Sequence, residues 1–100
     1  MDTKRVENKK LGIAFTLPEI LQGELEQFEA EIDPYVNDAQ RGTKLNSLYG
    51  AIVRAAAKVG WLNEAGITPE SVSTMKPNAV LFIGENIFAH VGEAREVPPS

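Results

Sequence analysis

The chain has 100 residues, of which 43% are hydrophobic and 24% are charged, and it contains no cysteine. This length is typical of one domain, and the ordinary composition argues against disorder over the whole length. The lack of cysteine excludes disulfides and thiolate catalysis, and the net charge of −4 argues against broad phosphate-backbone binding. No apolar stretch approaches the ~20 residues that span a bilayer, and the polar residues 1–10 predict no signal peptide. We therefore expect a soluble, cytoplasmic protein with no membrane partner.

Charge is distributed unevenly along the chain. Residues 1–10 are basic, residues 11–40 hold seven acids and no Lys or Arg, and residues 41–60 hold basic residues and no acid. One interpretation is that these are solvated faces of two neighbouring helices, which attract each other modestly. The other is a charge-complementary surface for self-assembly or for a partner.

The N-terminal part predicts an arm followed by a strand. Residues 1–10 are expected to form a flexible basic arm, residues 11–97 a single helical domain and residues 98–100 a tail. Apolar and small residues alternate from Leu11 to Phe15, which predicts a short strand. A single short strand is unstable alone, so it should pair within this chain or with another copy.

A first helix is predicted from a capping box that runs from Thr16 to Glu19. Gly23 weakens the early part, so the regular helix is expected nearer Glu24, and Asp33 before Pro34 should end it. Its apolar stripe has the spacing of one helix face and consists of Leu21, Leu25, Phe28 and Ile32.

The second helix has the strongest sequence signals. Thr43 is a suitable N-cap, the helix should run to Lys58 or Val59, and Gly60 suits the C′ position. Trp61 behind that glycine can fold back on the last turn. Its apolar positions form a broad stripe, namely Leu45, Leu48, Tyr49, Ile52, Val53, Ala56 and Val59.

Two further helices complete the predicted fold. A short helix should begin at Thr68–Glu70 and last to about Thr74, and Pro77 should open a third main helix that reaches about Arg95. Its core stripe is Val80, Ile83, Ile87 and Val91, broadened by Leu81, Phe82 and Phe88. The predicted class is mainly α: three main helices, one short helix and a short N-terminal strand.

Residues that could carry catalysis or bind a metal are not found. His90 is the only histidine and has no companion ligands at metal-binding spacing, so we expect a surface or boundary residue. Ser73 to Lys76 fits S-x-x-K without the companion motifs of that enzyme class, and is interpreted as a polar turn. The clustered acids of the first helix are expected to be hydrated and ionised. We predict no enzyme activity, no cofactor and no metal.

Two features could bind another protein. Trp61 is either a core anchor or an exposed interface residue. The helix around residues 79–91 is apolar over much of its circumference, so Leu81, Phe82 and Phe88 either complete the core or form a patch for a partner. A helix-turn-helix made by residues 43–60 and 69–75 is a further option, but the acidic first helix would repel DNA, so nucleic acid is not expected as a partner.

The order of these elements resembles a known group of proteins. The segments that carry the likeness are 23–29, 48–61, 72–77, 80–90 and 96–99. They resemble small proteins of the tail modules of long-tailed bacteriophages, among them tail assembly chaperones. The likeness covers roughly residues 20–99 in packing and turn residues, not in chemistry.

The resemblance implies a function in virion assembly. It implies a non-enzymatic helical protein of the host cytoplasm that binds the tape-measure protein and self-associates. It also implies an apolar groove, beside the 77–95 helix or around Trp61, that holds an amphipathic segment of this client. Alternatives are a small structural protein of the head, neck or tail, located in the virion, and a small regulator that binds DNA or inhibits a host enzyme.

Overall fold

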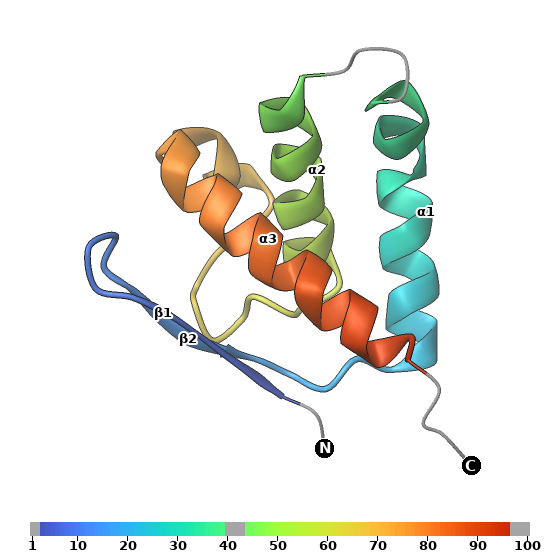
Figure 1. Cartoon of the computed structure of the whole chain (residues 1–100), viewed down its shortest axis with the longest axis horizontal. Helices are drawn as coiled ribbons and strands as arrows, with labels where there is room; N and C mark the ends of the chain where they lie inside the picture. The colour runs from blue at the N-terminus through green and yellow to red at the C-terminus, as the bar shows by residue number, and fades with distance from the viewer. Residues whose placement is uncertain (1–2, 40–43, 97–100) are drawn as a thin grey trace.

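The computed structural model describes residues 3–39 and 44–96 (Figure 1). The elements are β1 (Lys4–Asn8), β2 (Ile13–Leu17), α1 (Gln22–Ala39), α2 (Leu45–Lys58), the 3₁₀ helix η1 (Glu70–Thr74) and α3 (Pro77–Ala94). The mainly helical class, the three main helices and the short helix are as predicted. The N-terminal strand pairs within this chain, and its partner strand lies in the residues that were expected to form a flexible arm.

The two strands form an antiparallel hairpin. Val6 pairs with Phe15, and both are buried together with Leu17 on the face that packs on the helices. Gly12 has a positive φ of 68° and lies in the connecting turn, a conformation that glycine adopts without strain. Two expectations are therefore corrected: the described part of the basic arm is largely strand β1, and β2 begins at Ile13 rather than at Leu11.

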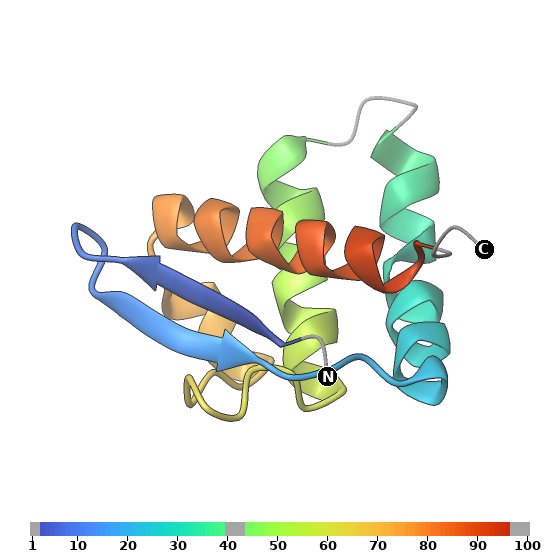
Figure 2. The same ribbon diagram turned by 60° about the horizontal axis from the view of Figure 1, so that its bottom comes forward.

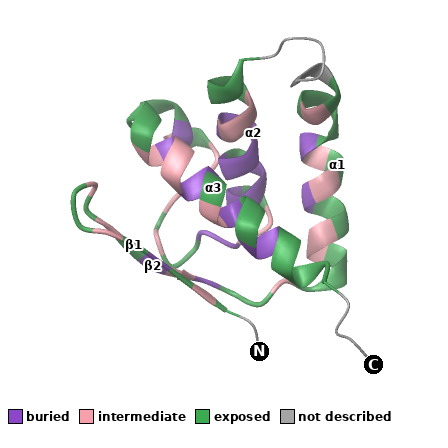
Figure 3. Cartoon of the chain, viewed as in Figure 1, coloured by how far each residue is buried: buried purple, intermediate pink, exposed green. Residues whose placement is uncertain are grey.

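The helices pack around α2 (Figures 1 and 2). Helices α1 and α2 lie side by side, and α3 crosses in front of both. The hairpin lies along α3, where Lys4 pairs with Glu93 at an Nζ–Oε1 distance of 3.4 Å. Burial is concentrated on the middle of α2 and on the inner face of α3 (Figure 3). These two helix surfaces form the centre of the hydrophobic core.

Helix α1 departs from its predicted bounds at both ends. Thr16 belongs to β2, so the predicted capping box is wrong; Glu24 instead accepts a hydrogen bond of 3.1 Å from the backbone N–H of Leu21, at the actual helix start. Pro34 lies inside the helix and does not end it. The helix continues because Val36, one turn beyond Ile32, still packs against the core. Leu21 is 59% exposed and is not part of the core stripe.

Helix α2 ends as the sequence predicts. Gly60 has a φ of 92°, its N–H bonds to the carbonyl of Ala57, and the N–H of Trp61 bonds to the carbonyl of Ala56. These two bonds make a Schellman motif, in which glycine at C′ satisfies carbonyls that the helix leaves free. The predicted N-cap Thr43 lies outside the described residues.

His90 is a core residue, which corrects the expectation of a surface or boundary position. It is 3% exposed, and its Nε2 lies 2.7 Å from the carbonyl oxygen of Pro18. A carbonyl can only accept, so Nε2 carries the hydrogen. The contact joins α3 to the segment between β2 and α1, which explains why the histidine is buried.

Candidate functional site

The four residues predicted to bind a partner lie in different environments. Trp61 is 2% exposed and packs on Phe28 with ring centroids 4.9 Å apart. It is therefore the core anchor, not an interface residue. Leu81 and Phe82 are half-buried, and Phe82 packs against the core. Phe88 is 36% exposed and is the member of the set that lines a surface groove.

That groove, called here the α1–α3 groove, lies between two helices that the sequence could not place together. It encloses about 490 Å³. Its described lining residues are Glu29, Ile32, Asp33, Val36, Phe88 and Arg95. Ile32, Val36 and Phe88 supply an apolar floor, while charged side chains stand along the edges. A floor of this kind between charged edges is suited to the apolar face of an amphipathic helix.

A second aromatic residue, Tyr49, fixes the position of Phe88. Its ring meets the ring of Tyr49 edge-on, with centroids 5.9 Å apart and an interplanar angle of 88°. This is a favoured aromatic geometry. Tyr49 is itself held by the close approach of α2 and α3, because a Cβ built at Gly84 would lie only 2.4 Å from Tyr49 Cδ1. The absent side chain at Gly84 thus allows the packing that presents Phe88 to the groove.

Ion pairs tie α1 to both other helices. Arg95 pairs with Glu29 at the end of the groove, and Lys58 of α2 pairs with Glu31 at 2.7 Å. The second pair is an attraction between the acidic and basic segments of the kind expected for neighbouring solvated helices. Asp33, by contrast, is exposed and has no ion-pair partner among the described residues.

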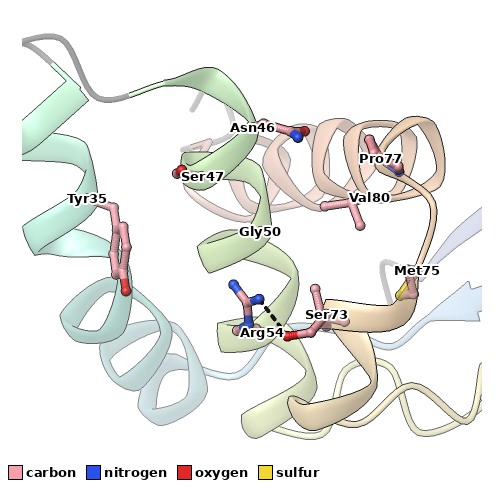
Figure 4. A pocket seen from close by; sticks show the side chains of 10 residues that line it. Tyr35, Asn46, Ser47, Gly50, Arg54, Ser73, Met75, Pro77 and Val80 are labelled. Atoms are coloured by element: carbon pink, nitrogen blue, oxygen red, sulfur yellow. Dashed lines mark hydrogen bonds between the residues drawn. The ribbon is translucent and has the colours of Figure 1, made fainter.

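A second hollow of about 430 Å³ lies over α2 (Figure 4). Figure 4 shows Tyr35 on one side and Ser73 and Met75 on the other, with Arg54 rising from α2 near Gly50. Arg54 donates a hydrogen bond of 3.1 Å to the hydroxyl of Ser73 and has no carboxylate partner in the described part of the chain. This surface is more polar than the α1–α3 groove and has the opposite sign of unpaired charge.

Other kinds of site are not favoured by the geometry. Among residues 3–39 and 44–96 there is no group of three side chains able to hold a metal ion. None of the helices in these ranges has the length and apolar character needed to cross a membrane. The second element of the considered helix-turn-helix is η1, a 3₁₀ helix of five residues, which is too short to serve as a recognition helix in a major groove.

Comparison with known proteins adds no identification. The chain matches no protein-family model, no curated protein and no solved structure.

Proposed function

We propose that this chain is a non-enzymatic protein-binding factor that holds an amphipathic segment of a partner protein in the α1–α3 groove. The observation that carries the proposal is the exposed ring of Phe88 beside Ile32 and Val36. A ring at this position remains open to a partner although the neighbouring core stripe of α3 is fully buried. Large aromatic side chains in such settings contribute strongly to binding.

The class of partner is proposed from the sequence resemblance. On that basis the protein is a tail assembly chaperone of a long-tailed bacteriophage, acting in the host cytoplasm. Its client is the tape-measure protein, a long helical protein with amphipathic segments. Binding those segments would shield them until the tail tube polymerises around them. The same groove in a permanent virion component would instead hold a neighbouring structural protein.

The test is co-expression with the tape-measure protein of the same genome, followed by size-exclusion chromatography. The wild-type chain is expected to co-elute with its client, and Phe88→Ser to lose at least about tenfold in affinity, the loss typical of a central aromatic contact. Leu45→Ser is the matched control, because Leu45 is 61% exposed and does not line the groove. Equal binding by a folded Phe88→Ser variant would contradict the proposal.

Mass spectrometry of purified virions separates the two assembly roles. A chaperone should be present in infected-cell lysate and absent from mature particles. Detection at stoichiometric copy number in the particles would contradict the chaperone role and establish a structural component.

A further inference from the structure

The charges of helix α1 beside the α1–α3 groove are negative. Glu26, Glu29 and Asp33 are spaced i, i+3 and i+7 on α1, so they lie on one face of that helix. Glu29 and Asp33 line the groove. The groove is therefore bordered on the α1 side by a ridge of carboxylates.

Most of these carboxylates have no cation beside them. Glu29 is paired with Arg95, whereas Glu26 and Asp33 are exposed and form no ion pair with any described residue. Arg95 is the one base among the described lining residues, and Glu29 already occupies it. On the other helix Glu85, three residues before Phe88, is also exposed without an ion pair in this part of the chain.

We infer that the α1–α3 groove takes a basic amphipathic helix, whose apolar residues cover Phe88 and Val36 and whose Lys or Arg side chains face Asp33 and its neighbours. This inference rests on the proposed function and specifies the chemistry of its partner. Opposite charges along the edges of an apolar contact steer association and exclude partners of the wrong sign. An acidic helix would place carboxylates against the unpaired acids of the ridge and would be rejected.

The second hollow has the reverse preference. Its unpaired charge is the guanidinium of Arg54, which suits a carboxylate and repels a basic segment. Basic and acidic probes therefore report on different surfaces of the molecule, and a basic helix bound by this protein should lie in the α1–α3 groove.

The experiment uses two designed peptides of about 18 residues, long enough for a stable helix. Both carry leucine at the same i, i+3, i+4 and i+7 positions, and they differ only in having lysine or glutamate at the polar positions. Affinity is measured by fluorescence anisotropy of the labelled peptides at physiological salt. The bound surface is located by amide chemical shifts, for which Val36 and Phe88 report on the groove.

The wild-type chain should bind the lysine peptide roughly tenfold more tightly than the glutamate peptide, as expected for several partly exposed ion pairs. Asp33→Lys should reduce this preference to about threefold or less, whereas Glu7→Lys should leave it within about twofold of the wild type. Glu7 is the matched control because it is exposed on strand β1, gives the same change in net charge, and lines neither the α1–α3 groove nor the surface around Arg54.

Each alternative outcome is decisive. If both peptides shift the groove resonances with equal affinity, the proposed function stands and the inference of a basic partner is overturned. Equal losses in Asp33→Lys and Glu7→Lys would also overturn it, because the preference would then come from net charge alone. If neither peptide shifts the groove resonances, the proposed function fails together with the inference.

Discussion

The carboxylate of Glu24 accepts hydrogen bonds from two segments at once: its Oε1 lies 3.2 Å from the indole Nε1 of Trp61 and 3.1 Å from the backbone nitrogen of Leu21. One side chain therefore fixes the start of α1 and attaches it to the largest residue of the core. Phe28, one turn further along α1, packs against the same indole ring. The beginning of α1 is thus joined to the end of α2 by a polar and an apolar contact.

Glu24→Ala should destabilise the protein by about 1–2 kcal/mol, because two donors lose a charged acceptor that is only half-buried. Urea unfolding followed by tryptophan fluorescence measures this loss directly at Trp61. Glu26→Ala is the control, since Glu26 is exposed and, within the described part of the chain, accepts a hydrogen bond only from Gln22 of the same helix. Equal effects of the two substitutions would contradict the bridging role of Glu24.

Two glycines of α3 should respond oppositely to alanine. Gly84→Ala places a methyl group against the ring of Tyr49, so we expect a loss of about 1–3 kcal/mol from overpacking. Gly92 is helical and has open space within 4 Å of the position that a Cβ would take, so Gly92→Ala should gain about 0.4–1 kcal/mol by reducing the freedom of the unfolded chain. Thermal and urea unfolding of both variants measure the difference, and a stabilised Gly84→Ala would contradict the close approach.

Gly84→Ala should also weaken binding in the groove. The added methyl group displaces the Tyr49 ring, and this ring contacts and positions Phe88. The lysine peptide should therefore bind less tightly to Gly84→Ala than to Gly92→Ala. Unchanged affinity in a folded Gly84→Ala variant would show that Phe88 is positioned independently of Tyr49.

His90→Leu should destabilise the protein by about 0.5–1.5 kcal/mol, the net contribution of a typical hydrogen bond, because Pro18 is exposed and water can replace the lost donor. The carbonyl of Pro18 is the group that loses its donor. Calorimetric unfolding of the variant gives the magnitude. Nitrogen-15 NMR of the wild type provides an independent check, because Nε2 should carry a hydrogen; an Nε2 without one would contradict the contact.

Pro34→Ala should stabilise the protein by about 1–3 kcal/mol. A proline inside a helix lacks the N–H that would bond to the carbonyl four residues earlier, and its ring crowds that carbonyl. Pro34 is exposed, so no core contact is lost on substitution. An unfolding free energy that falls, rather than rises, would mean that the proline sets the course of α1 in a way that alanine cannot reproduce.

The parts of the fold predicted well are those with local, mutually consistent signals. Helix α2 has a broad apolar stripe and a glycine at C′, and α3 begins at a proline suited to a first turn. Both signals lie within the element itself, so no knowledge of the partner elements is needed.

The errors arise where tertiary packing outweighs local preference. Pro34 is a poor residue for a helix interior, yet Val36 beyond it reaches the core. Strand β1 has one buried apolar residue, Val6, so its alternation of apolar and polar residues is weak. A better signal for the hairpin is Gly12, which lies in a four-residue connection between two extended segments. The sequence predicts an apolar groove beside residues 77–95, but not that α1 lines its other side, because that depends on which faces α1 and α3 turn toward each other.

At the outer edge of β2, a charged side chain covers a backbone donor that a further strand would need. The backbone N–H of Thr16 bonds to the carboxylate of Glu64 at 2.6 Å, and Arg5 of β1 lies 3.7 Å from the same carboxylate. An incoming strand would need that N–H for its own carbonyl, and would first have to displace a charged side chain. Exposed strand edges are templates for aggregation. Glu64 thus protects this edge against strand-to-strand polymerisation with other copies of the chain.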